Sequence, residues 1–409
     1  MKFDVFHSIG RIDSVYPKLS DRQVFQQFFD QVIAAETLGY ETIWVAESHF
    51  SSEVQKQNPE PVIPNYHGEV GLNADSVQLA GMICERTERI GFGTAIMNIV
   101  GGNGGPIAAA DRVRSLAWHN SLRQTPRKLW MGVASGRFPY INRPFGISPR
   151  SAVETALWNQ YQGLIFTEAL EIFLRLLRGE TISSDQVTKH KITRANFRDQ
   201  SQFDGAREKL RSTGVSLEES GFDYVNRWNF ERLKLVPDMS AAEIDANLRC
   251  VLGSSDPYAR SVGLKFADLD IFNLSFTPPD ALNKLHTEMF DRYREAGRAW
   301  HRSRLPRTVL VFIDRDRQAA FEAASKCFDT YIEAMRGTVQ LPSKKFLMER
   351  ALIGTPADIK QALSPDDPHG FHSEDRLMLW FEFNEPDNKK ILHQMRLFAE
   401  EVAPHFRSS

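Results

Sequence analysis

The stretch "YETIWVAESHF" (residues 40–50) passes from an apolar run directly into a polar one. Its first part, "TIWVA", contains the β-branched and aromatic residues that are typical of a buried strand. Its second part places Glu47, Ser48 and His49 where that strand should end. A carboxylate, a hydroxyl and an imidazole at this point indicate either the rim of an active site or a polar loop that leaves the core. Periodicity alone leaves both interpretations open.

Similar short apolar runs recur along the 409 residues, and longer amphipathic segments separate them. Eight predicted strands that alternate with helices favour an α/β fold, a (β/α)8 TIM barrel, over a doubly wound sheet. The other strand candidates are "KFDVF", "RIGFGTAIM", "KLWMGVA", "LRCVLG", "LDIFNLSF", "RTVLVFI" and "RLMLWFEF". The helical patterns cover residues 22–38, 74–86, 107–122, 152–177, 257–265, 280–299, 317–335 and 388–402.

Residues 179–245 interrupt this alternation. The interval is polar and rich in charge, as in "SSDQVTKHKITRANFRDQ", and the next strand begins only at Leu248. We therefore expect one barrel domain over residues 1–409, with an insertion between helix 4 and strand 5. A segment of this length and composition is typical of a lid, an interaction arm or a partly disordered loop.

The charge and cysteine content exclude several classes of protein. The 50 basic residues nearly balance the 52 acidic ones, so no electrostatic argument favours a nucleic acid or an anionic membrane as partner. Cys84, Cys250 and Cys327 lie far apart and form no CxxC pair, which argues against a disulfide framework and a structural zinc site. There is no signal-peptide pattern and no run of about 18 apolar residues. We expect a cytoplasmic protein with no membrane partner and no metal site.

Polar and glycine-rich residues follow nearly every predicted strand. In a parallel barrel the active site lies at the carboxyl ends of the strands, so these residues should meet at one rim. Glycine and serine also simply terminate strands, so the pattern alone does not establish a ligand site. The strand ends in question are His7, the "ESHF" run, "GTAIMN" with Asn98, "GVASGRFPY", "GSSDPYAR", "NLSF" and "WFEFNEP".

The fifth strand end is suited to an anion. In "VLGSSDPYAR", Gly253, Ser254 and Ser255 precede a helix whose first turn contains Pro257, and a serine or Asp256 can cap it. Backbone N–H groups at such a turn are a ready cradle for phosphate. An ordinary helix cap without a ligand is equally consistent with the residues.

The fourth strand end offers a second group of the same kind. "GVASGRF" places Ser135, Gly136 and Arg137 after the strand, and the guanidinium of Arg137 could clamp a phosphate. A turn with a solvent-exposed arginine is the alternative. Neither segment matches a Walker A loop or a dinucleotide fingerprint.

Six motifs in order give the chain a wider resemblance. They are "AAETLGYETIWVAESHF", "ICERTERIGFGTAIM", "KLWMGVASGRF", "VLGSSDPYAR", "LIGTPADIKQAL" and "QMRLFAEEVAPHF". Together they resemble the bacterial luciferase-like family of flavin-dependent barrel oxidoreductases, across nearly the whole chain except the insertion. Gly105 and Pro106 stand where that family usually has His-Pro, which is a departure from the pattern.

The resemblance implies a site for FMN, or a related flavin, at the carboxyl rim of the barrel. His49 would then be the catalytic residue near the reactive edge of the flavin, with Ser48 beside it and Glu47 orienting it or packing beneath it. The flavin ring would rest against Ala95 and Ile96, where the family often has a cis peptide that does not involve proline. The residues implied to bind the cofactor are Ala95, Ile96, Asn98, Ser135, Gly136, Arg137, Gly253, Ser254 and Ser255.

The activity implied first is that of a two-component monooxygenase. Such an enzyme uses O2 and reduced FMN, supplied by a partner flavin reductase, to oxygenate a small organic substrate, and it is commonly a homodimer. Ser48 stands where the luciferases have the first of two consecutive histidines. A single histidine followed by Phe50 also resembles the dehydrogenases and reductases of the same superfamily that use the deazaflavin coenzyme. A flavin-binding barrel without catalytic activity is a third alternative.

Overall fold

The computed structural model of the protein describes residues 1–15, 17–136, 138–197, 199–215, 221–254, 256–338, 341–365 and 367–407. The strands are β1 (Lys2–His7), β2 (Arg11–Ile12), β3 (Thr42–Val45), β4 (Gly68–Glu69), β5 (Gly91–Asn98), β6 (Leu129–Ala134), β7 (Lys191–Ile192), β8 (Phe222–Asp223), β9 (Leu248–Leu252), β10 (Leu269–Ile271), β11 (Arg307–Ile313), β12 (Leu352–Gly354) and β13 (Arg376–Trp380). All eight strands predicted from the sequence are present.

The helices include one in each predicted amphipathic segment, and the segment over residues 152–177 is divided into two helices. They are α1 (Asp21–Thr37), α2 (Ser52–Gln55), α3 (Ser76–Arg86), α4 (Gly105–Ser121), α5 (Pro139–Asn142), α6 (Ala152–Ala156), α7 (Trp158–Leu177), α8 (Gln200–Arg211), α9 (Ala241–Asn247), α10 (Pro257–Gly263), α11 (Pro279–Glu295), α12 (Arg317–Ala334), α13 (Lys344–Arg350), α14 (Pro356–Ala362) and α15 (Asn388–Leu397). Short 3-10 helices span Arg143–Phe145, Ser184–Gln186, Arg194–Asn196, Arg302–Arg304 and Ala403–His405, and a π-helix, η5 (Phe398–Val402), continues α15.

Nine of these strands form one sheet in the order β10-β9-β6-β5-β3-β1-β13-β11-β12, while β2 pairs with β4 and β7 pairs with β8. β1 pairs in parallel with β3 on one side and with β13 on the other. A parallel bridge between Asn273 and Arg307 joins the segment after β10, the first strand in this order, to β11, the last but one. The fold is therefore the predicted α/β barrel, with β12 as an additional strand beside β11.

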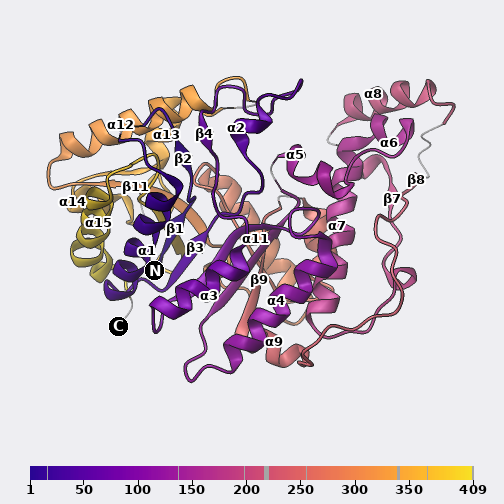
Figure 1. Ribbon diagram of the computed structural model, residues 1–409, viewed down its shortest axis with the longest axis horizontal. Coiled ribbons are helices and arrows are strands. Elements are labelled where there is room, and N and C mark those ends of the chain that lie inside the picture. Colours follow the sequence, from indigo (N-terminus) through magenta and orange to yellow (C-terminus); the bar gives the residue numbers. More distant parts are fainter. Residues whose placement is uncertain are drawn as a thin grey trace. The chain divides into compact units, whose positions relative to one another are not determined.

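The chain divides into two compact units. The first comprises Met1–Ile96, Gln124–Gly132 and Asp270–Ser409, and the second comprises Met97–Arg123 and Val133–Leu269. In the first unit α1 lies beside α15, and in the second α4 lies beside α7 (Figure 1). The segment between α7 and β9, where the sequence predicts an insertion, contains β7, α8, β8 and α9.

Side chains along β1 alternate between the barrel interior and the helix layer. Asp4 accepts a hydrogen bond from Trp44 Nε1 at 2.7 Å, and both of its carboxylate oxygens lie 2.8 Å from Arg376 Nη1. These three side chains come from adjacent strands and meet inside the barrel. Phe3, on the opposite face of β1, packs edge-on against Phe398 of η5 with 5.2 Å between ring centroids. Even positions of β1 therefore face inward and odd positions face the helices.

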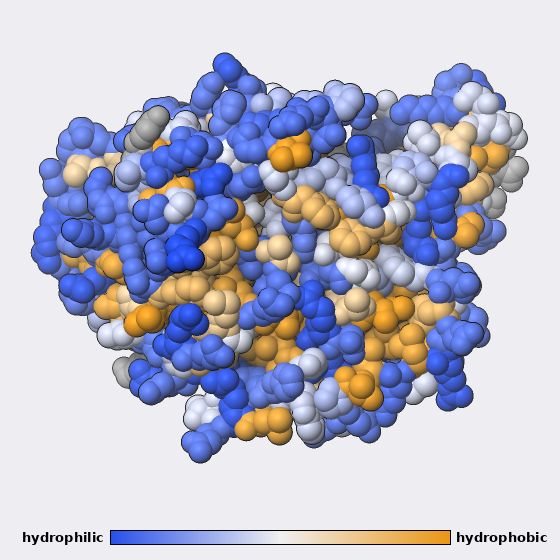
Figure 2. Space-filling model, viewed as in Figure 1, coloured by the Kyte–Doolittle hydropathy of each residue, from blue (hydrophilic) through white to orange (hydrophobic). Residues whose placement is uncertain are grey.

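Hydrophilic residues cover most of the face shown in Figure 2, and hydrophobic residues form smaller groups between them. Among the described residues, no helix combines the length and the apolar character needed to cross a membrane.

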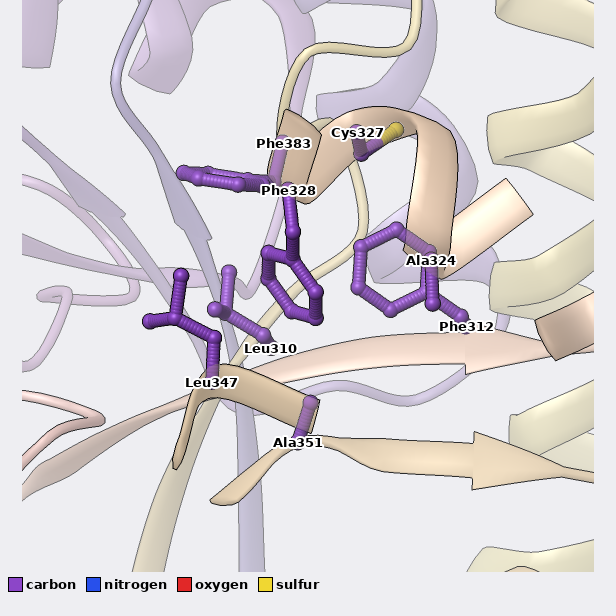
Figure 3. Close-up of a cluster of buried hydrophobic side chains, with 8 residues drawn as sticks. All are labelled: Leu310, Phe312, Ala324, Cys327, Phe328, Leu347, Ala351 and Phe383. Carbon is purple, nitrogen blue, oxygen red and sulfur yellow. The ribbon is translucent and has the colours of Figure 1, made fainter. Parts of the chain in front are cut away.

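A cluster of apolar side chains fixes α12 and α13 on β11. Figure 3 shows Phe328 of α12 between Leu310 and Phe312 of β11 and Phe383, which follows β13. Phe328 contacts both other rings, with centroids 5.4 Å from Phe312 and 5.9 Å from Phe383. The contact with Phe312 is edge-on, and such a contact adds to the stabilisation from burial alone. The whole cluster consists of Leu310, Phe312, Ala324, Cys327, Phe328, Leu347, Ala351 and Phe383.

Phe328→Ala should lower the free energy of unfolding by about 3–5 kcal/mol, because it leaves a cavity among these rings. Chemical denaturation at 25 °C would measure the change. Phe321→Ala is the matched control, since Phe321 lies on the same helix but is 39% exposed, and it should change stability by less than about 1 kcal/mol. Equal losses in the two variants would contradict this account of the cluster.

Candidate functional site

Glu47 and His49 form a buried pair just after β3. His49 Nε2 lies 3.1 Å from Glu47 Oε1, and the Glu47 side chain is 0% exposed. Glu47 Oε2 accepts a hydrogen bond from the backbone N–H of Ser76 at 3.4 Å. A carboxylate on Nε2 favours the tautomer in which that nitrogen carries the proton. Glu47 therefore orients the imidazole. Nδ1 is then the ring nitrogen that is left to accept a proton.

The backbone around this pair is fixed by residues 71–73. Ser48 N donates to Asn73 O at 2.9 Å, and Asn73 Nδ2 donates to Ala46 O at 2.9 Å. A Cβ on Gly71 would lie 2.9 Å from Ser48 Cβ, so only glycine allows this close approach. Phe50 then adopts φ 64° and turns the chain into α2. The predicted residues Glu47, Ser48 and His49 are thus held together in one rigid turn.

The peptide bond between Ala95 and Ile96 is cis, as the family resemblance led us to expect. The neighbouring backbone is tightly packed, because a Cβ on Gly132 of β6 would lie 2.2 Å from Thr94 O. The hydroxyl of Thr94 also donates to Gly132 O at 2.8 Å. Ala95 is buried, and Ile96 is partly exposed.

In the second unit, Asn98 supports the turn after β6. Its Nδ2 donates to Asn142 Oδ1 at 2.8 Å, and its Oδ1 accepts two backbone N–H groups from the loop that follows it. Asn142 Nδ2 in turn donates to Ser135 O at 2.7 Å. Gly136 has φ +82°, and a Cβ there would lie 2.5 Å from Asn98 Nδ2. Asn98 thus uses its amide within the protein and shapes the turn at Ser135 and Gly136.

The turn after β9 lies next to the turn after β6, because Gly253 N donates to Val133 O at 3.0 Å. Ser254 Oγ accepts a hydrogen bond from Asp256 N at 3.1 Å. Asp256 caps α10 by accepting from Tyr258 N, which confirms one of the two caps predicted from the sequence. The other two predicted ligands of a phosphate, Arg137 and Ser255, lie outside the described residues.

Sequence reasoning did not single out Glu382, which follows β13 on its inward-facing side. Glu382 Oε1 accepts hydrogen bonds from Ser8 N at 2.5 Å, Ser8 Oγ at 2.8 Å and Trp380 Nε1 at 3.1 Å. Burial raises the pKa of Glu382 above its ordinary value, although these donors oppose the shift. The motif "WFEFNEP" indicated a polar strand end, but its register was needed to identify the residue that faces inward.

His7 was expected at the same rim, and this expectation was wrong. Because it occupies an odd position of β1, its ring faces the helix layer and packs edge-on against Phe28 of α1 at 5.1 Å. His7 is 2% exposed, and burial lowers its pKa to about 3. It is a neutral core histidine near physiological pH.

The pKa of His7 links folding to pH. The unfolded chain binds a proton near the ordinary value of 6.5, whereas the folded chain does so only near 3. Stability is therefore lost as pH falls from 6.5 toward 3. Between pH 7 and pH 5 the wild-type protein should lose about 2 kcal/mol more than His7→Phe. Denaturation at both pH values measures this difference, and an identical pH dependence in the two proteins would contradict the assignment.

Three comparisons describe what the chain is similar to. A model of the luciferase-like monooxygenase family matches residues 1–367. The sequence matches no curated protein.

Within the described residues, no three His, Cys, Asp or Glu side chains are arranged to hold a metal ion.

Several solved structures share the fold. Monooxygenase RslO1 from Streptomyces bottropensis has a TM-score of 0.69 at 18% identity, and the match covers 100% of both chains. The oxygenating constituent of 3,6-diketocamphane monooxygenase from Pseudomonas putida, in complex with FMN, gives 0.62 at 15% identity, covering 100% of this chain and 99% of that chain. An F420-dependent secondary alcohol dehydrogenase gives 0.56 at 13% identity with the same coverage.

Proposed function

Because the chain belongs to the luciferase-like monooxygenase family, we propose that it is a flavin-dependent monooxygenase that oxygenates a small organic substrate. The oxidant would be O2, and reduced FMN would come from a separate flavin reductase. The proposal includes a homodimeric state and a cytoplasmic location. The observation that carries it is the buried Glu47 that orients His49 at the carboxyl end of β3.

The residues present fit a flavin. We propose that its phosphate binds the turns at Ser135 and Gly136 and at Gly253 and Ser254, which the hydrogen bond between β9 and β6 brings together. The positive φ of Gly136 and the amide of Asn98 shape the first turn, so Asn98 would act as a support. The flavin ring would lie against Ala95 and Ile96.

The protein's own groups would then control protons and water. A bound reduced flavin supplies the electrons that activate O2. His49, oriented through Nε2, would accept or return a proton at Nδ1. Glu382 has a raised pKa and can act as a second proton-holding group on the inward face. Phe6 and Trp380, whose ring centroids are 4.7 Å apart, would form an apolar wall of the site and limit the access of water.

A dehydrogenase or reductase that uses the deazaflavin coenzyme is the second candidate. The single histidine followed by Phe50 favours it, since Ser48 removes the paired histidines of the luciferases. The similarity to an F420-dependent secondary alcohol dehydrogenase is compatible with this alternative at the level of the fold. Both candidates use the same rim and the same His49.

Cofactor choice distinguishes the two candidates directly. The purified protein should bind reduced FMN and consume O2 in a substrate-dependent manner, which an oxygen electrode can follow with a general flavin reductase and a panel of ketones, alkanes and aromatics. Anaerobic reduction of the deazaflavin by a secondary alcohol, without oxygen consumption in the FMN assay, would instead favour the second candidate. Binding of neither flavin would contradict the proposal.

His49→Ala should lower kcat about 100- to 10,000-fold, because it removes the group that moves the proton. Glu47→Gln keeps the shape of the side chain but removes the charge that fixes the tautomer, and should lower kcat in the same direction with a changed pH profile. His119→Ala is the control, since His119 is exposed on α4. Unchanged turnover in His49→Ala would remove this residue from the mechanism.

Gly136→Ala should weaken FMN binding at least about tenfold, because a Cβ would collide with Asn98 and distort the phosphate turn. Fluorescence titration of FMN measures the Kd. Gly146→Ala is matched to it, since Gly146 also has a positive φ, +76°, but a Cβ there meets nothing within 4 Å. Both variants share the backbone cost of about 1 kcal/mol. Equal FMN affinity in the two variants would argue against a phosphate site at this turn.

A further inference from the structure

A pocket of about 660 Å³ lies in the second unit, between α8 and the segment where α6 ends and α7 begins. The helices α6 and α8 lie side by side there (Figure 1). Small-molecule sites typically enclose about 300–1,000 Å³. None of the described residues that line this pocket belongs to the strand ends that form the candidate site. It is therefore a separate cavity, and it is large enough for a ligand.

One face of α8 borders the pocket. The lining residues of this helix are Gln202, Gly205, Ala206 and Lys209, at the spacing of a single helix face. Gly205 lies in the interior of α8, where glycine is less favourable than any residue except proline. A Cβ built on Gly205 meets no described atom within 4 Å. Glycine at this position therefore costs helix stability but keeps the pocket open right up to the backbone.

The facing walls provide side-chain amides. Asn159 and Gln160 line the pocket, and within the described part of the chain their side-chain amides have no hydrogen-bond partner. Asn196 also lines it, and its Oδ1 accepts from Thr193 N at 2.7 Å, which leaves its Nδ2 group as a donor. A carboxamide offers an acceptor oxygen and two N–H donors. The pocket thus presents groups that donate and accept hydrogen bonds without carrying charge.

Trp158 supplies an aromatic ring to the same pocket. The guanidinium of Arg227 lies over this ring, 5.5 Å from its centroid, and is itself paired with Glu154 at 2.6 Å. Arg227 does not line the pocket, so the part of the ring that borders the pocket is not the face that Arg227 covers. These contacts hold the ring in place before a ligand binds, which lowers the entropic cost of binding.

The charges around the pocket select a neutral ligand. Lys209 is the one charged side chain among the described lining residues, and it is exposed. A single exposed ammonium adds little to the binding of an anion. No described lining residue has a carboxylate that would bind a cation. A neutral saccharide fits these groups, because its hydroxyls donate and accept hydrogen bonds and the C–H faces of its rings pack on an aromatic side chain.

We propose that this pocket binds a neutral disaccharide. Its hydroxyls pair with the amides of Asn159, Gln160 and Asn196, one of its rings packs on Trp158, and it approaches the backbone of α8 at Gly205. The site shares no residue with the proposed flavin site and does not depend on the proposed function.

The test uses cellobiose and maltose with the full-length protein in the absence of flavin. A two-dimensional ¹H–¹⁵N spectrum follows the indole N–H of Trp158, which is assigned by its loss in Trp158→Phe. At least one of the two disaccharides should shift this signal saturably, with a Kd on the order of millimolar. Gly205→Leu extends a side chain into the pocket and also raises helix propensity. It should raise the Kd at least about tenfold, while the melting temperature stays at or above that of the wild type.

Ser201→Leu is the matched control, because Ser201 is exposed on α8 but does not line the pocket. Its Kd should equal that of the wild type. Absence of a saturable shift with both disaccharides would overturn the proposal, and so would equal affinity of Gly205→Leu and the wild type. Tighter binding of citrate than of either disaccharide would indicate an anion site at Lys209 and would overturn it as well. The indole signal is measured on the wild-type protein, so the test stands even if a variant fails to fold.

Discussion

The alternation of side chains along β1 determines where the polar groups of the first unit lie. Asp4 faces inward and forms a buried ion pair with Arg376 of β13, while Trp44 of β3 donates to the same carboxylate. Removing one partner of such a pair leaves an uncompensated buried charge, which commonly costs about 3–5 kcal/mol. A shift of one residue in the pairing of β1 would turn its helix-facing side chains toward the barrel interior. The pair therefore fixes the register of three adjacent strands.

The proposed chemistry follows from this register. Position 8 faces inward, so Ser8 reaches Glu382 at the carboxyl end of β13. His7, one residue earlier, faces the helices and packs edge-on against Phe28 of α1. On the neighbouring strand, the buried carboxylate of Glu47 orients His49 at the same edge of the barrel. An imidazole held by a buried carboxylate is suited to proton transfer in flavin chemistry.

Much of this fold could be predicted from the sequence, because strands buried on both faces appear as continuous apolar runs and helices keep their own period. The helix expected over residues 152–177 is instead divided into α6 and α7. The two-residue strands β2, β4, β7 and β8 are too short to leave a periodic signal. The cis bond at Ala95 and Ile96 was accessible only through the family resemblance. Strand register decides that Glu382 faces inward and His7 faces outward. Tertiary hydrogen bonds give Asn98 its supporting role. Neither can be read from a single sequence.

A crystal structure of the protein with FMN tests the central claim most directly. The phosphate should accept hydrogen bonds from the turns at Ser135 and Gly136 and at Ser254, and the ring should lie against Ala95 and Ile96. His49 should then be within hydrogen-bond reach of the flavin, directly or through one water. A phosphate bound outside these turns, or a flavin ring remote from His49, would contradict the assignment of this rim as the active site.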